Sequence, residues 1–170
     1  MVWDKENEAW ANLFVKSKKL DFDWTSIMYA SHSGQCGKFN ITKSGGVVTF
    51  SGVGNSGSDY HRCTATTTIR FNFTKYKNLK IVFPKITIPD SSYYGQSEFE
   101  IALCYDYSSS GSAVSPTVRL DHIEQHGISI INKECNFDIS EISGEYKVYV
   151  YGGTYPGSGI QIQLSEIIVS

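Results

Sequence analysis

Short segments in which apolar and polar residues alternate run through most of this sequence, and they limit the folds that it can adopt. Residues 98–103, 146–151 and 160–165 alternate most regularly, with an aliphatic or aromatic residue at almost every second position. A period of two predicts β-strands that bury one face and expose the other. Loops rich in Ser and Gly, at 52–59 and 107–116, separate such segments. No strand-helix-strand pattern occurs, which excludes parallel α/β folds.

The strands predicted in this way number about nine or ten and follow one another at short, regular spacing. We therefore predict an all-β fold, an antiparallel β-sandwich of jelly-roll type, with a closed barrel as the alternative. Leu79, Ile81 and Phe83 mark one apolar face. Pro84 is expected to break or bulge that strand before the pattern resumes at Ile86. With 170 residues, the chain has the length of one domain.

The first twenty residues follow a different pattern. Asp4 is suited to cap a helix, and the apolar residues around it, including Trp3 and Trp10, recur at roughly helical spacing. We predict a short N-terminal helix in an attachment segment, residues 1–20, followed by the β-sandwich domain, residues 21–170. Two roles for the segment stay open. It docks on the chain's own sandwich, or it attaches the chain to a partner, as a homo-oligomer or as part of a larger assembly.

Charge and hydropathy exclude several classes of protein. The formal net charge is −2, so no basic excess attracts nucleic acid. The N-terminus lacks a basic start followed by an apolar run, so no signal peptide is predicted. The longest apolar stretches span about five residues, far short of the roughly 20 that a membrane helix needs, and no membrane span is expected.

The four cysteines, Cys36, Cys63, Cys104 and Cys135, lie far apart in the sequence. They form no CxxC pair and have no paired histidine nearby, which argues against a structural zinc site. Four cysteines allow three sets of disulfide pairings. Without a secretion signal, we expect mostly reduced thiols that are buried on strands.

Residues with catalytic chemistry occur without a recognisable catalytic arrangement. His122 and His126 have the spacing of a helical zinc pair, but Ile123 follows the first of them, and a turn between strands is the better interpretation. Glu98 and Glu100 share one face of a predicted strand about 6.6 Å apart, a separation that glycoside hydrolysis accepts. We interpret them as residues on a solvated strand face. No nucleophile or phosphate-binding motif is present, and the chain is predicted to be non-enzymatic.

Tyrosines gather near strand ends and loops in the second half of the chain. A tyrosine combines a flat apolar ring with a polar hydroxyl and has little rotamer entropy to lose, which suits a binding surface. Tyr149 and Tyr151 alternate with apolar residues and so share the outward face of one strand. We predict that a glycan binds here, and the alternative is ordinary cross-strand packing. The candidate ligand-binding residues are Tyr105, Tyr107, Tyr149, Tyr151 and Tyr155.

Two stretches of the sequence resemble a known family. Asn-Leu-Lys-Ile-Val-Phe at 78–83 and the segment 137–150, with Asp-Ile-Ser-Glu-Ile-Ser-Gly-Glu-Tyr, are similar to recurrent strands of one kind of β-sandwich. These are the carbohydrate-binding-module-like (galactose-binding-like) jelly rolls of bacteriophage tail and receptor-binding proteins. The resemblance covers roughly residues 24–170. It implies a non-enzymatic module that binds a glycan or a cell-surface receptor, in a phage tail (virion) or in a larger extracellular protein.

The same resemblance implies a metal position. In many such jelly rolls an acidic residue on the closing strand helps to hold a structural calcium ion, and Glu166 stands at the matching place. Asp21 and Asp23 are candidates for further ligands, since calcium takes about six to eight oxygens. No other cofactor is predicted. Two other functions stay open: a structural protein that docks on a partner through the Trp-bearing N-terminal segment, and an accessory domain of a glycoside hydrolase.

Overall fold

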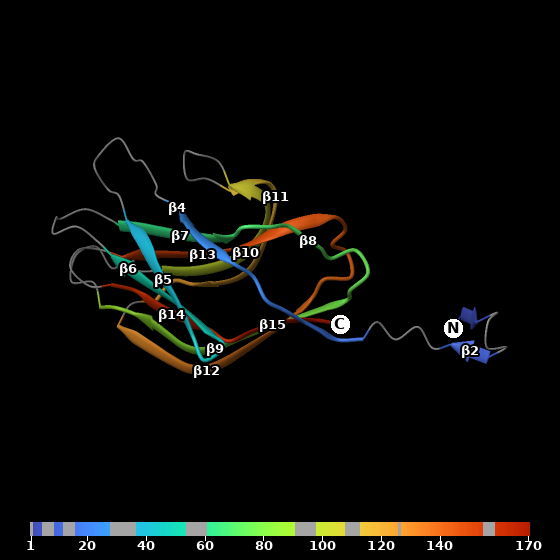
Figure 1. Ribbon diagram of the computed structural model, residues 1–170. Coiled ribbons are helices and arrows are strands. Elements are labelled where there is room, and N and C mark those ends of the chain that lie inside the picture. The colour runs from blue at the N-terminus through green and yellow to red at the C-terminus, as the bar shows by residue number, and fades with distance from the viewer. Residues whose placement is uncertain are drawn as a thin grey trace.

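The structure, a computed structural model, describes residues 2–4, 9–11, 16–27, 37–53, 61–90, 98–107, 113–125, 127–154 and 159–170. Within these residues the regular elements are β-strands, and the strands pair in antiparallel fashion. Two sheets lie as two layers (Figure 1). The predicted all-β, antiparallel architecture is therefore confirmed. The two layers agree with a sandwich, and its jelly-roll type stays a prediction.

The two sheets divide the strands as follows. The first sheet has six strands in the path β11-β10-β13-β7-β4, with β8 paired to β13. Its strands are β4 Trp24–Ile27, β7 His61–Thr67, β8 Phe71–Asn72, β10 Glu98–Tyr107, β11 Ala113–Ile123 and β13 Glu145–Thr154. The second sheet has seven strands in the path β3-β15-β9-β14-β6-β5, with β12 paired to β9. Its strands are β3 Lys18–Leu20, β5 Lys38–Ser44, β6 Val47–Val53, β9 Asn78–Ile88, β12 Ile128–Asp138, β14 Gln161–Leu164 and β15 Glu166–Val169.

The core lies between the two layers and takes the apolar positions that the alternation predicted. Phe99 and Leu103 of β10 are fully buried, and so are Val148 and Val150 of β13. Their neighbours in the sequence point to the other side of the sheet. The Phe99 ring meets the ring of Phe83, on β9, edge to face with centroids 5.4 Å apart. This contact joins the two sheets.

Pro84 does not interrupt its strand. β9 continues through it, and its pairing with β12 keeps one register on both sides. The buried side chains change parity there, because Phe83 before the proline and Ile86 after it both face the core. At the same level of β12, Asn132 adopts a φ of 53°, a left-handed conformation that Asn tolerates better than most residues. The change of core-facing side in β9 thus coincides with the unusual backbone conformation of its partner strand. Both halves of β9 bury their apolar residues as a result.

The predicted N-terminal helix is wrong for the residues that are described. Val2–Asp4 and Ala9–Ala11 form an antiparallel pair, β1 and β2, with Trp3 opposite Trp10. Val and Trp favour strands, and an isolated helix of this length is marginal in water. Lys18–Leu20 pairs with β15, so the last residues of the predicted attachment segment belong to the sandwich.

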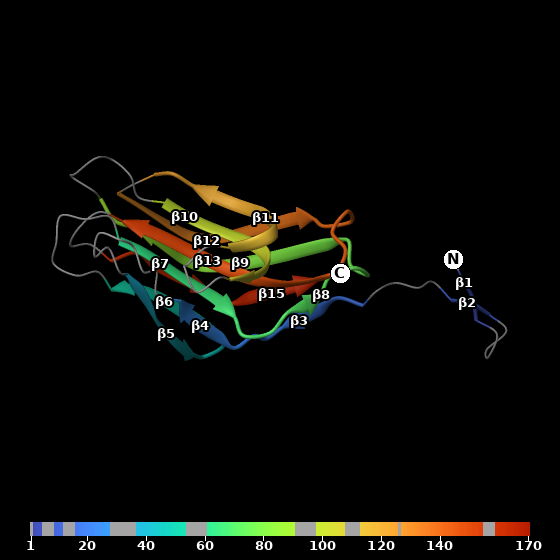
Figure 2. The same ribbon diagram turned by 90° about the horizontal axis from the view of Figure 1, so that it is seen from above.

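The β1–β2 hairpin stands apart from the sandwich. In both views it lies beyond the start of β3, away from the two layers (Figures 1 and 2). It forms a two-stranded sheet of its own, to which no described strand of the sandwich is paired. In the part of the chain that the structure describes, no helix has the length and hydropathy needed to cross a membrane.

Candidate ligand-binding face

The first sheet turns a polar face away from the core. Because the apolar residues of β13 point inward, Tyr149 and Tyr151 point outward. On β10, Glu100 lies opposite Tyr151, and β11 places His122 opposite Glu100 on its other side. We call this surface the outer face, with Glu98, Glu100, Arg119, His122, Lys147, Tyr149 and Tyr151.

Glu100 is buried on the outer face, although it carries a carboxylate. Only 8% of the residue is exposed. The Tyr149 hydroxyl donates to its Oε1, and Arg119 Nε lies 2.8 Å from its Oε2. The expectation that Glu100 lies on a solvated strand face is therefore wrong. Two donors from neighbouring strands replace the water that the carboxylate has lost.

Glu98, at the start of β10, has a second set of partners. The Tyr151 hydroxyl donates to its Oε1 at 2.9 Å, and His122 Nε2 lies 2.9 Å from its Oε2. The same nitrogen lies 3.7 Å from Oε1 of Glu124. His122 thus belongs to strand β11 and not to the expected turn, while His126 lies outside the described residues.

The ring of Tyr149 packs into a small apolar cluster on the outer face. The residue is 6% exposed and contacts Ala102 and Cys104. A buried ring has no face to offer to a sugar, so the predicted stacking role is wrong for Tyr149. Its hydroxyl instead helps to hold Glu100.

The described cysteines are buried on strands, as predicted. Burial raises the pKa of the Cys104 thiol to about 12, and the nearby Asp106 carboxylate adds to the rise. Burial also raises the pKa of Cys135 to about 11. Both thiols are therefore protonated and unreactive at neutral pH. Cys63 is buried on β7, and Cys36 lies outside the described residues.

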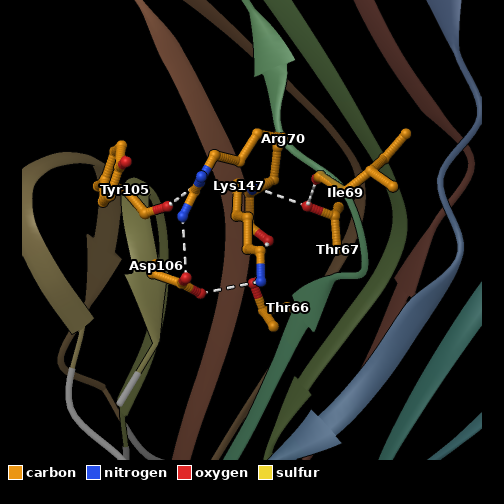
Figure 3. A network of polar contacts seen from close by, with 8 residues as sticks. Thr66, Thr67, Ile69, Arg70, Tyr105, Asp106 and Lys147 are labelled. Atoms are coloured by element: carbon orange, nitrogen blue, oxygen red, sulfur yellow. Dashed lines mark hydrogen bonds and ion pairs between the residues drawn. The ribbon is translucent and has the colours of Figure 1, made fainter.

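At the other end of β10, Tyr105 is exposed and held by polar contacts. The Arg70 guanidinium lies over its ring, with Cζ 3.9 Å from the centroid, and Arg70 Nε donates to the Tyr105 carbonyl oxygen at 2.7 Å. Figure 3 shows Arg70 and Lys147 converging on Asp106, where Nη2 and Nζ each lie 2.9 Å from a carboxylate oxygen. These contacts fix the ring and the two cations relative to one another.

Exposed apolar side chains flank this polar cluster. Ile69 is 61% exposed, and Val114, which lies opposite Asp106 on β11, is 37% exposed. Together with Tyr105 they are three of the four large hydrophobic side chains that are exposed in the described part of the chain. The Thr67 hydroxyl donates to the Ile69 carbonyl at 2.9 Å and fixes the turn that carries Ile69 (Figure 3). We call this surface the Tyr105 patch, with Arg70, Tyr105, Asp106, Val114 and Lys147.

The structure places the five predicted tyrosines in different settings. Tyr105 is exposed, Tyr151 is half-buried and Tyr149 is buried. The side chain of Tyr107 and the whole of Tyr155 lie outside the described residues. Among the described tyrosines of this set, Tyr105 is the most exposed.

Glu166, the predicted calcium ligand, forms an ion pair with a lysine. Its Oε1 lies 3.0 Å from Lys19 Nζ on the adjacent strand β3. Asp21 lies 2.6 Å from Lys43 Nζ. The first strand of the sandwich therefore lies beside the closing strand, as the calcium prediction assumed. Lysines, however, pair with two of the three candidate carboxylates. Calcium at Glu166 stays a prediction.

A hollow of about 210 Å³ opens beside these ion pairs. Its apolar lining includes Phe22, Trp24, Val48 and Ile167. Phe22 is only 6% exposed, and Trp24 packs edge to face on the core residue Phe50. Its aromatic rings are thus committed to the core, and the Tyr105 patch is the stronger candidate for a ligand.

No protein-family model matches the sequence, and no curated protein matches it. Among solved structures, the chain is similar to the enzymatically active domain of tailspike protein 4 of bacteriophage CBA120. The identity is 11% and the TM-score 0.45, and the match covers 86% of this chain but only 19% of that one. The chain is similar to the carbohydrate-binding module TmCBM27, described as specific for mannan, at 12% identity and a TM-score of 0.43, covering 90% and 96% of the two chains.

A third similar structure is the K1 cleaved adhesin domain of Lys-gingipain from Porphyromonas gingivalis W83. Its identity is 13% and its TM-score 0.45, and the match covers 91% of this chain and 96% of that one. Similarities of this size assign no function to the chain. The function proposed below rests on the side chains of the chain itself.

Proposed function

We propose that this chain is a non-enzymatic β-sandwich module that binds carbohydrate through the Tyr105 patch. The observation that carries the proposal is the Tyr105 ring, which is 45% exposed and lies under the Arg70 guanidinium, 3.9 Å from its centroid. A sugar stacks its C–H face on such a ring while its hydroxyls take hydrogen bonds from fixed polar groups. The patch offers both kinds of contact at one place.

The polar groups of the patch suit a hydroxylated ligand. Arg70 and Lys147 each donate to one oxygen of Asp106. Both cations keep further donors, since a guanidinium carries five N–H groups and an ammonium three. Two cations beside one carboxylate favour a glycan that carries a carboxylate or phosphate over a neutral one.

The contacts of Glu100 support a non-enzymatic role. Glu100 accepts a hydrogen bond from Tyr149 and pairs with Arg119. A carboxylate held in this way is poorly placed to donate a proton or to attack a sugar, the two roles that glycoside hydrolysis requires. The proposal includes a phage tail or another extracellular assembly as the place of action, which the resemblance of residues 78–83 and 137–150 supports.

A glycan array with neutral and acidic oligosaccharides tests the proposal. We expect the full chain to bind a subset of them, with acidic glycans preferred. Tyr105→Ala is expected to weaken binding of the best glycan about tenfold in calorimetric titration, because the stacking contact is lost. Tyr105→Phe keeps the ring and is expected to bind within about twofold of the wild type.

Ile131→Ala is the matched control for the loss of an exposed apolar side chain. Ile131 is 58% exposed on β12 of the other sheet, and its removal is expected to leave glycan affinity unchanged. The proposal is contradicted if the array shows no binding. It is equally contradicted if Tyr105→Ala binds as tightly as the wild type.

We propose as a second function that the β1–β2 hairpin attaches the module to another copy of this chain. The hairpin lies apart from the sandwich (Figures 1 and 2), and each of its strands has three residues. An isolated two-stranded hairpin is marginally stable at best in water. A packing partner outside the sandwich supplies the missing contacts.

Light scattering on the full chain and on a version that lacks residues 1–15 tests this attachment. This cut spares β3, which pairs with β15. We expect the full chain to form an oligomer and the shortened chain to be a monomer with the same thermal unfolding midpoint. A monomeric full chain, or an oligomer that survives the truncation, contradicts the attachment.

A further inference from the structure

Three side chains with metal-binding chemistry meet at the end of the outer face that is farther from the Tyr105 patch. Glu98, His122 and Glu124 each offer one ligand atom, and these atoms lie within 4.8 Å of one another. Glu98 opens β10, seven residues before Tyr105, which corresponds to about 23 Å at roughly 3.3 Å per residue. The cluster is therefore separate from the glycan site proposed above.

The two distances from His122 to the carboxylates are close to those around a divalent ion of the zinc class. Zinc binds imidazole nitrogen and carboxylate oxygen at about 2.0–2.2 Å, so two ligands of a tetrahedral ion lie about 3.4 Å apart. His122 Nε2 lies 2.9 Å from Oε2 of Glu98 and 3.7 Å from Oε1 of Glu124. Both distances come within about half an ångström of the tetrahedral value.

The sheet orients two of the three ligands before any ion binds. His122 and Glu98 are held on paired strands, and their side chains are 18% and 28% exposed. The Tyr151 hydroxyl donates to Oε1 of Glu98 at 2.9 Å, while Oε2 faces His122. Hydrogen bonds of this kind orient metal-binding carboxylates and raise metal affinity. Glu124, whose side chain is 75% exposed, follows β11 and completes the set.

We propose that Glu98, His122 and Glu124 bind a divalent transition-metal ion, Zn²⁺ in preference to others, with Tyr151 as a positioning residue. One imidazole beside two carboxylates suits zinc, whereas Mg²⁺ and Ca²⁺ take oxygen ligands. The two carboxylates balance the charge of the ion. Three protein ligands leave the fourth position to water or to an oxygen of a bound molecule.

Calorimetric titration of the EDTA-treated full chain with ZnCl₂ tests the site. We expect one tight equivalent in the wild type, and no comparable affinity for Ca²⁺. Glu124→Gln removes the most exposed ligand and should leave the fold intact, so we expect at least a tenfold loss of zinc affinity with an unchanged unfolding midpoint for the metal-free protein. Tyr151→Phe is expected to weaken zinc binding severalfold without abolishing it.

Glu134→Gln is the matched control, because Glu134 is an exposed carboxylate paired with Lys80 at 2.8 Å on the other sheet. Its zinc affinity is expected to equal that of the wild type. Cobalt replacement adds a second readout, since Co²⁺ at this site is expected to show the visible absorption of a four- or five-coordinate ion. The inference is overturned if the wild type binds no zinc. It is also overturned if His122→Gln and Glu124→Gln bind zinc as tightly as the wild type.

Discussion

Phe83→Ala is expected to lower the free energy of unfolding by about 3–5 kcal/mol. Phe83 is fully buried on β9 and meets the equally buried Phe99 of β10 edge to face, with centroids 5.4 Å apart. The substitution removes the apolar burial, the contact between the two rings and the packing between the layers at once, and it leaves a cavity. Urea unfolding followed by tryptophan fluorescence measures the loss.

A loss of about 3–5 kcal/mol is a large part of the total stability of a domain. Two variants with smaller expected losses therefore test the same prediction. Phe83→Leu refills most of the cavity and is expected to cost roughly 1–2 kcal/mol. Ile131→Ala on the paired strand β12, where the side chain is 58% exposed, is expected to stay within about 0.5 kcal/mol of the wild type. A Phe83→Ala protein as stable as the Ile131→Ala protein contradicts the assignment of Phe83 to the contact between the sheets.

The alternation of apolar and polar residues predicted the fold correctly for strands that have one face toward the core and the other toward solvent. Phe99 and Val148 are buried as expected, because alternate residues of a strand point to the same face and the apolar set of each strand faces the other sheet. The pattern predicted neither the path of β9 through Pro84 nor the N-terminal hairpin. The first depends on the left-handed conformation of Asn132 on another strand, and the second on cross-strand pairing of Trp3 with Trp10. Neither interaction is visible in the alternation of apolar and polar residues.

The candidate sites were harder to predict, because their residues meet only through strand register. Arg70 and Asp106 are 36 positions apart in the sequence, and Tyr149 and Glu100 are 49 positions apart. The available signal was the presence of acidic residues within apolar strands of a chain that is only 19% charged. An acid at such a position is costly to bury without partners, so it points to partners on the neighbouring strands. Tyrosine content alone could not separate the exposed Tyr105 from the buried Tyr149.

Arg119→Met is expected to lower the free energy of unfolding by about 2 kcal/mol. Arg119 Nε lies 2.8 Å from the Glu100 carboxylate, whose side chain is 11% exposed. Methionine keeps the aliphatic length of the arginine but leaves a nearly buried charge with one donor fewer, the Tyr149 hydroxyl remaining. Because Arg119 itself is 61% exposed, the loss is expected to be smaller than the 3–5 kcal/mol of a fully buried pair. Urea unfolding at neutral pH and constant ionic strength measures it.

Glu100→Gln in the Arg119→Met background distinguishes an unpaired charge from lost packing. If the buried charge causes the loss, the neutral amide removes the cause, and the double variant is expected to recover about 1 kcal/mol relative to Arg119→Met alone. The exposed pair of Lys19 and Glu166, at 3.0 Å, is the control, and Lys19→Met is expected to cost well under 1 kcal/mol. Equal losses for Lys19→Met and Arg119→Met, or a double variant less stable than Arg119→Met, contradict the buried charge at Glu100. The stability regained by Glu100→Gln therefore tests directly whether Glu100 carries a buried charge that Arg119, on the neighbouring strand, stabilises.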